Sequence, residues 1–166
     1  NTLSIEDYSS SDFIKSSNNF LIQKDLKIEN KNIVFEKNYW KISASHNGYF
    51  KKFKLDHHRE IEFYPEQFKF IGHDKIVRKD PDKQIKFDIR FHLHPDSKVM
   101  KTQNSKFILI QLEDEGWQFS CDNYDINIDN GLYFGNKNSY QENQNIFISG
   151  MNNESEQIIR WEIIKI

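Results

Sequence analysis

Alanine and long hydrophobic runs are almost absent from this sequence. Ala44 is the single alanine among 166 residues, although alanine is the residue that favours helices most strongly. No long window keeps the 3.6-residue apolar period that an amphipathic helix requires. The longest dense apolar patch, residues 107–110, has the size of a strand and is far too short to span a bilayer. These absences predict an all-β protein without a membrane segment.

Cysteine and excess positive charge are also lacking. Cys121 is the only cysteine, which excludes an internal disulfide. A net charge of −2 and a pI near 6.3 give no sign of the basic face that nucleic-acid-binding proteins carry. The sequence contains no Gly-rich phosphate loop, no G-x-S-x-G motif, no paired-cysteine zinc spacing and no clear nucleophile triad. We therefore expect neither nucleic acid nor a membrane as a partner.

Aromatic residues are abundant instead. They make up 14% of a chain whose apolar fraction is only 37%, so Phe, Tyr and Trp must supply much of the core volume. The length fits one domain, residues 1–166, with no internal repeat or linker. The chain begins with Asn1 rather than Met and shows no signal peptide, so we expect a processed, trimmed or excised piece of a longer protein.

Residues 85–94 give the clearest structural pattern, with strict alternation of apolar and polar side chains. Such alternation predicts a strand with one face in the core and the other in water. Ile85, Phe87, Ile89, Phe91 and Leu93 are expected in the core, and Lys86, Asp88, Arg90, His92 and His94 on the solvent face. Pro95 ends the run because it cannot donate a ladder hydrogen bond.

Short strand-like runs bounded by Asn, Asp, Gly or Pro recur along the rest of the chain. We predict strands at 20–28, 32–36, 39–45, 49–54, 58–64, 67–71, 84–94, 106–112, 116–120, 123–128, 145–149 and 157–165. The pair Asn47-Gly48 predicts a tight turn between two of them. This spacing is typical of an antiparallel β-sandwich, of jelly-roll or supersandwich type, with little helix. Trp40, Trp117 and Trp161 lie in alternating patterns and are expected in the core.

Three groups of residues are candidates for chemistry. His92 and His94 form an H-x-H pair that suits a metal, with a third ligand to come from His46, His57, His58 or His73, but the favoured interpretation is two ordinary half-exposed histidines on a solvated sheet face. We assign no metal ligand.

Residues 57–59 point alternately to opposite faces, with His57 and Arg59 on one side and His58 on the other. A histidine here suits acid–base work, but a hydrogen bond within the sheet and an Arg59–carboxylate pair are favoured. His46 and Tyr49 flank the predicted turn, where they suit either sugar recognition or a structural role.

The order of these motifs resembles the C-terminal β-rich region of heparinase II/III-like polysaccharide lyases. The segments that carry the resemblance are Asn1-Thr2-Leu3, His46-Asn47-Gly48-Tyr49, His58-Arg59 followed by Asp74, Arg90-Phe91-His92-Leu93-His94-Pro95-Asp96, Gly116-Trp117-Gln118-Phe119, Tyr133-Phe134-Gly135 and Arg160-Trp161-Glu162. They cover nearly the whole chain, and the ordered set is more specific than any single motif. The second arginine that the family has after its H-R pair is replaced here by Glu60.

The resemblance implies a lyase that cleaves acidic, uronate-containing polysaccharide by β-elimination. It places the main catalytic residues upstream, in an α-helical toroid and an H-x-H-x-D-like segment, and also implies a structural zinc site in the parent protein. We therefore assign no catalytic residue and no cofactor to this chain, and expect an acidic polysaccharide and the toroid as partners. The resemblance favours a bacterial protein of the periplasm or the exterior.

Within this framework His46, Tyr49, Arg90, His92 and His94 are the candidates for lining or supporting the substrate cleft. Three alternatives stay open: a non-catalytic carbohydrate-binding module, a purely structural domain that packs on the toroid, and a self-contained metal-dependent enzyme that uses His92 and His94.

Overall fold

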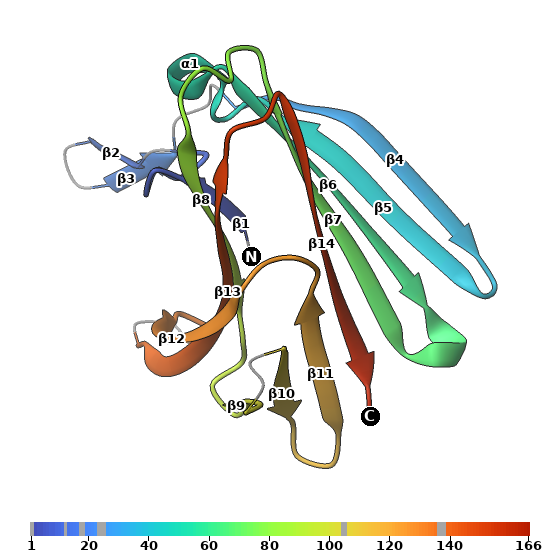
Figure 1. The fold of residues 1–166 in the computed structure, drawn as a ribbon. Helices are drawn as coiled ribbons and strands as arrows, with labels where there is room; N and C mark the ends of the chain where they lie inside the picture. The colour runs from blue at the N-terminus through green and yellow to red at the C-terminus, as the bar shows by residue number, and fades with distance from the viewer. Residues whose placement is uncertain (1, 12, 17–18, 23–25, 104–105, 136–138) are drawn as a thin grey trace.

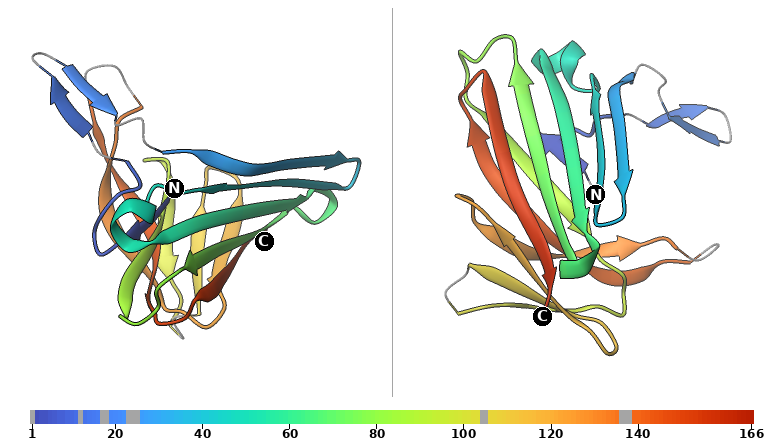
Figure 2. Two further views of the ribbon diagram at one scale, coloured as in Figure 1. Left: turned by 90° about the horizontal axis from the view of Figure 1, so that it is seen from above. Right: turned by 90° about the vertical axis from the view of Figure 1, so that its right-hand side faces the viewer.

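The protein folds into two antiparallel sheets with a small separate hairpin (Figures 1 and 2). A computed structural model describes residues 2–11, 13–16, 19–22, 26–103, 106–135 and 139–166. The strands are β1 (Thr2–Ile5), β2 (Phe13–Ser16), β3 (Asn19–Ile22), β4 (Ile28–Glu36), β5 (Tyr39–His46), β6 (Leu55–Tyr64), β7 (Lys69–Arg78), β8 (Ile85–His92), β9 (Lys98–Lys101), β10 (Phe107–Gln111), β11 (Gly116–Cys121), β12 (Ile126–Tyr133), β13 (Gln141–Asn152) and β14 (Glu156–Lys165). The predicted all-β antiparallel sandwich is thereby confirmed.

The two sheets differ in size. The large sheet has eight strands in the order β4-β5-β6-β7-β14-β11-β10-β9, and the small sheet has four in the order β1-β8-β13-β12. Among the described strands, β2 and β3 form a separate two-stranded sheet. The described helical segments are the single turn α1 (Phe50–Phe53) and a 3₁₀ turn at Pro65–Gln67, and no described helix is long and apolar enough to cross a membrane.

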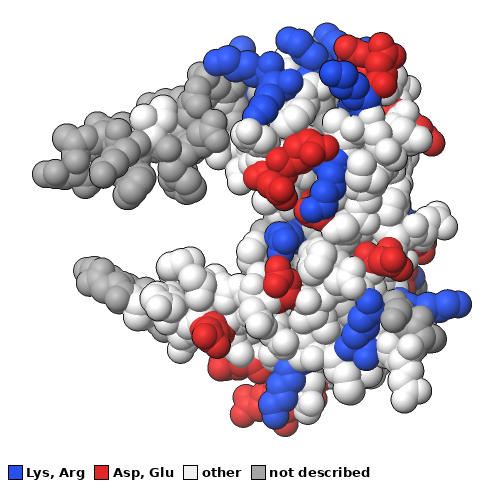
Figure 3. Space-filling model, turned by 60° about the vertical axis from the view of Figure 1, so that its left-hand side comes forward, with Lys and Arg blue, Asp and Glu red and all other residues white. Residues whose placement is uncertain are grey.

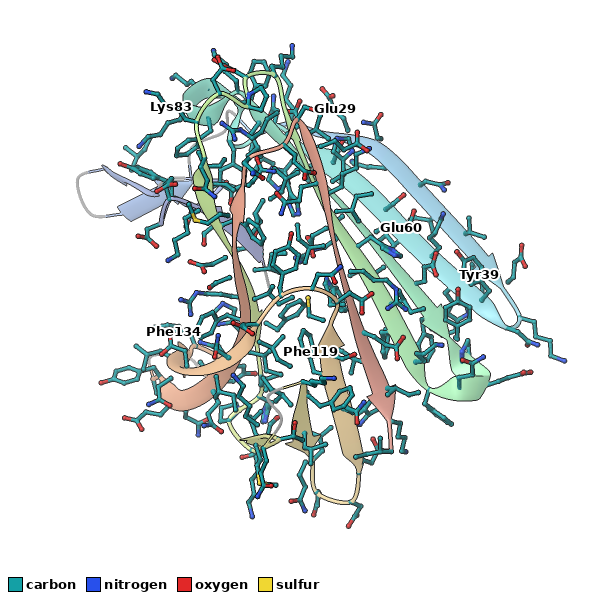
Figure 4. The ribbon with its side chains drawn as sticks, viewed as in Figure 1. Glu29, Tyr39, Glu60, Lys83, Phe119 and Phe134 are labelled. Atoms are coloured by element: carbon teal, nitrogen blue, oxygen red, sulfur yellow. The ribbon has the colours of Figure 1, made fainter. Side chains whose placement is uncertain are left out.

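The alternating side chains of β8 place one face of this strand in the core between the two sheets. Ile85, Phe87, Ile89 and Phe91 are buried, as expected. Phe91 meets Phe119 of β11 and Trp161 of β14 edge to face, with ring centroids 4.9 and 4.8 Å apart. Figure 4 shows Phe119 pointing into the space between the sheets.

One residue of the predicted solvent face of β8 is not in solvent. Asp88 is only 5% exposed. The Ser149 hydroxyl donates a hydrogen bond to its carboxylate, and Lys86 Nζ lies 3.2 Å away. Asp88 pairs with Ser4 on one neighbouring strand and with Ser149 on the other, and the Ser149 and Lys86 side chains contact its carboxylate. A single-strand pattern does not reveal such neighbours.

The large sheet extends well beyond the small one, so that part of its inner face is left uncovered (Figure 2, left). Cross-strand pairing aligns Ile33 with Ile42 and Phe35 with Trp40. These four side chains, which we call the open apolar patch, are 72%, 52%, 75% and 40% exposed, respectively. The prediction that Trp40 lies in the core is therefore wrong, because no strand of the small sheet reaches it. Trp161 is buried as predicted, and Trp117 is half-buried.

Several predicted boundaries differ from the structure. The predicted strand at 49–54 is instead the helical turn α1, which the Asn47-Gly48 turn introduces. An added Cβ at Gly48 would lie 2.5 Å from the Ser10 carbonyl oxygen, so the turn depends on the absence of a side chain there. The predicted strand at 20–28 is divided between β3 and β4, and residues 23–25 lie outside the described part of the chain. β1, β2 and β9 were not predicted, and β7 and β13 are longer than expected.

Candidate functional site

Two histidines and an aspartate form a chain of hydrogen bonds on the inner face of the large sheet, with His57 and Asp74 buried and His46 half-buried. His46 Nε2 lies 3.0 Å from His57 Nδ1, and His57 Nε2 lies 2.6 Å from Asp74 Oδ1. The three side chains come from the adjacent strands β5, β6 and β7, where the register pairs His46 with His57 directly. We call this arrangement the His–His–Asp chain.

Asp74 is the most buried member and accepts two further hydrogen bonds. Its side chain has no exposed surface, and Arg59 Nε and Trp161 Nε1 donate to its two oxygens at 2.7 and 2.8 Å. Burial alone would raise the pKa of this carboxyl, but the hydrogen bond from His57 and the charge of Arg59 outweigh it and lower the pKa. The carboxylate is therefore ionised and holds the inner face of β6, β7 and β14 together.

The backbone around His46 fixes the direction of these hydrogen bonds. Gly48 N–H donates to His46 Nδ1 at 3.2 Å, so this nitrogen carries no proton. His46 Nε2 must then donate to His57 Nδ1, and His57 Nε2 in turn donates to Asp74. Burial, together with His57 and Arg59, lowers the pKa of His46 to about 4. His46 is consequently neutral at physiological pH and serves as a donor rather than a cation.

Tyr49 connects this region to the small sheet. Its side chain is 1% exposed, and its hydroxyl donates a hydrogen bond to the carbonyl oxygen of Leu3 in β1. Its ring lies beside the His46 ring, with centroids 5.7 Å apart. Burial raises the pKa of Tyr49 to about 12. Tyr49 therefore packs between His46 and β1, and almost none of its surface is accessible to a ligand.

Arg90 and His92 lie elsewhere, on the face of the small sheet that points away from the large sheet. Arg90 Nη1 is 3.0 Å from Asp129 Oδ2, and its guanidinium lies 4.9 Å from the centroid of the Phe147 ring. His92 is exposed and stands opposite Asn145. Burial of part of the ring lowers the pKa of His92, although a hydrogen bond with Asn145 opposes this shift. Figure 3, turned to bring this side forward, shows acidic and basic groups next to each other.

His94 follows the end of β8 and contacts different groups from His92. Its ring lies 5.2 Å from that of Tyr133, and its Nδ1 is 3.3 Å from Asp96. Within the described residues, no group of three or more His, Cys, Asp or Glu side chains is arranged to hold a metal ion. The predicted site residues thus form two separate groups. His46 and Tyr49 lie together beside the inner face of the large sheet, and Arg90 and His92 lie on the outer face of the small sheet. His94 lies beyond the end of β8.

Sequence reasoning missed several buried residues that lie in or beside these two groups. It noted Asp74 only within a motif, and it did not anticipate that Trp161 donates to it across 87 residues of sequence. It also missed Asn143 and Asn145, which are buried beside β12. An added Cβ at Gly131 would lie 2.1 Å from Asn145 Nδ2, so this glycine leaves room for the two amides. The strand register, had it been known, would have identified all of them.

Known proteins agree with this fold. The chain matches the family described as "Heparinase II/III-like, C-terminal" over residues 1–162. Similar solved structures include the heparan sulfate lyase HepC from Pedobacter heparinus, at TM-score 0.71 and 13% identity over 84% of this chain and 22% of that one. A heparinase III structure gives TM-score 0.64 and 14% identity over 100% of this chain and 23% of that one.

A curated relative is FtsZ-localized protein C from Caulobacter vibrioides. It is 25% identical over 155 residues, which are 88% of this chain and 27% of that protein. The chain therefore spans about a quarter of the length of the relatives it matches. Because the family model matches nearly all of the sequence, the chain belongs to the heparinase II/III-like C-terminal family.

Proposed function

We propose that this chain is the C-terminal β-sandwich of a polysaccharide lyase that cleaves uronic-acid-containing glycans by β-elimination. The observation that supports this most directly is the family match over residues 1–162. The reaction requires a group that neutralises the uronate carboxylate, a base for the C5 proton and an acid for the leaving oxygen. The relatives are longer than this domain, and we propose that the base and the acid belong to that additional part of the protein.

Arg90 is the residue of this chain best suited to the first of these tasks. Its guanidinium is oriented by Asp129 and Phe147, while its side chain remains 34% exposed. A planar guanidinium can donate two parallel hydrogen bonds to a carboxylate, which a lysine cannot do. His92 lies on the same face, where its imidazole can hydrogen-bond a sugar hydroxyl. In this proposal His46 and Tyr49 act indirectly, by supporting the fold beneath the turn at Asn47 and Gly48.

The test is a lyase assay on the full-length protein that contains this chain. Heparan sulfate, heparin and chondroitin sulfate are supplied separately, and the new C4=C5 double bond of the unsaturated uronate is followed by ultraviolet absorbance. We expect product with at least one of them, and we expect Arg90→Lys to raise KM. Absence of unsaturated product from every uronate glycan would contradict the proposal.

A second candidate is a non-catalytic module that binds carbohydrate or contributes structure alone. It is supported by the relative FtsZ-localized protein C, which is 25% identical to this chain and whose name gives a location at FtsZ and no reaction on a glycan. Glycan binding without any product in the same assay would support this candidate. Product formation together with a raised KM for Arg90→Lys would exclude a purely structural domain.

A further inference from the structure

Lysines gather around a pocket beside α1, at the end of the sandwich where β6 begins. The pocket has a volume of about 960 Å³, and its lining includes Lys27, Lys51, Lys52 and Lys54 but no described Asp or Glu. The four lysines contribute a formal charge of +4, whereas the whole chain carries −2. Figure 3 shows Lys and Arg side chains concentrated at the top of the molecule, the end at which Figure 1 places α1.

Among the residues that the structure describes, none of these four lysines forms an ion pair with a carboxylate. Elsewhere Lys41 pairs with Glu60 at 3.0 Å, and Lys75 pairs with Glu156 at 2.6 Å. Neighbouring like charges repel one another, so an uncompensated group of lysines is most stable when an anion binds between them. The charge therefore indicates an anionic ligand.

The walls of the pocket are aromatic. Lys52 Nζ lies 2.8 Å from the centroid of the Tyr8 ring and 5.5 Å from that of Phe53. Lys54 Nζ lies 5.4 Å from the centroid of the Phe50 ring. Flat rings provide an apolar surface for the C–H face of a sugar, while ammonium groups at their edges reach its charged substituents. A pocket of this size is at the upper end of the usual range for ligand sites.

We propose that this lysine pocket binds anionic oligosaccharide, through the sulfate or carboxylate groups of the sugars. The inference rests on the proposed function, because a uronate glycan is the ligand class that both sites would share. The pocket is a separate site from the face that carries Arg90 and His92, and it contacts the turn at Asn47 and Gly48 that also fixes His46. A long polyanionic chain bound here would be held on the protein independently of its cleavage.

The experiment measures binding of a heparan sulfate oligosaccharide to the protein by calorimetry at low and physiological salt. The test variant is Lys51→Glu with Lys52→Glu, and the matched control is Lys37→Glu with Lys98→Glu, which makes the same charge change at exposed positions far along the sheet. We expect the test variant to weaken binding by at least about tenfold and the control by less than about twofold, because only the former places acids in the pocket. Raised salt should weaken binding to the unchanged protein.

Three results would overturn the inference: no binding by the unchanged protein, equal loss in both variants, or equally tight binding of single-stranded DNA or anionic vesicles. A neutral glucan should not bind. The outcome is distinguishable from that of the lyase assay. If no unsaturated product forms but the oligosaccharide still binds in the pocket, only the proposed function is rejected. If product forms but Lys51→Glu with Lys52→Glu does not change binding, only the pocket is rejected.

Discussion

His57 Nε2 lies 2.6 Å from Asp74 Oδ1, and both side chains are buried. This pair joins β6 to β7 on the inner face of the large sheet, and it depends on a carboxylate that also accepts hydrogen bonds from Arg59 and Trp161. Stability of the inner face should therefore respond strongly to changes at Asp74.

Asp74→Asn should lower the free energy of unfolding by about 3 kcal/mol, because it removes the charge that compensates the partly buried Arg59 and disturbs several buried hydrogen bonds. Urea unfolding measures this change. The matched control is Asp129→Asn, which breaks the exposed pair with Arg90 and should cost less than about 1 kcal/mol. Equal effects of the two substitutions would show that Asp74 is not the centre of the cluster.

His46 should make stability fall at mildly acid pH. Its pKa is lowered to about 4 in the folded protein, below the ordinary value of 6.5. The unfolded chain therefore binds a proton that the folded chain rejects, so the His46 contribution is complete above about pH 6.5 and is lost as the pH falls towards 4. His46→Gln should reduce the stability difference measured by urea unfolding between pH 7 and pH 5. His94→Gln, at an exposed position, should leave it unchanged.

Gly72→Ala should destabilise the core severely. An added Cβ would lie 2.0 Å from Cζ2 of Trp161, which cannot move because its ring packs against Phe91 and its indole N–H binds Asp74. We expect a loss of about 3 kcal/mol or more, measured by thermal and urea unfolding with tryptophan fluorescence as a second signal. Gly116→Ala is the control, because its nearest neighbour is the flexible end of Ile166 at 3.1 Å. A cost below 1 kcal/mol at Gly72 would contradict the packing.

The open apolar patch should govern solubility rather than stability. Phe35→Ser with Ile33→Ser should reduce binding of a hydrophobic dye and self-association, because both side chains are more than two-thirds exposed. The free energy of unfolding should change by no more than about 1 kcal/mol. Light scattering and dye fluorescence measure the first effect and urea unfolding the second. A loss of several kcal/mol would show that these side chains belong to the core.

The sequence predicted those parts of the fold that a single strand specifies. Alternation over residues 85–91 located the buried side of β8 correctly, because its period matches the pleat of a strand. The alternation of His57, His58 and Arg59 also predicted correctly that His57 and Arg59 share a side and that Arg59 pairs with a carboxylate. In each case the information lies within a few consecutive residues.

The errors arose where neighbouring strands decide the outcome. Trp40 has the pattern of a core residue but is 40% exposed where the large sheet extends past the small one, and Asp88 has the pattern of a surface residue but is buried beside Ser149 of the neighbouring strand. The hydrogen bond from Trp161 to Asp74 requires β14 to pair with β7, and local periodicity does not contain that pairing. The helical turn α1 replaced a predicted strand because the backbone at Lys54 adopts a left-handed conformation that closes a single turn.

Because the two sheets differ in width, we expect local unfolding to begin in one part of the molecule. β7, β14 and β11 are covered by the small sheet, whereas β4 and β5 extend past it and are held mainly by their ladder hydrogen bonds (Figure 1). Local opening should therefore start at β4 and proceed inward, with amide hydrogens of β4 exchanging first and those of β14 last. β4 has nine residues and forms one edge of the large sheet, so the outward peptide groups of this strand have no partner among the described strands. When this hairpin opens and closes, another extended chain can form hydrogen bonds with these groups.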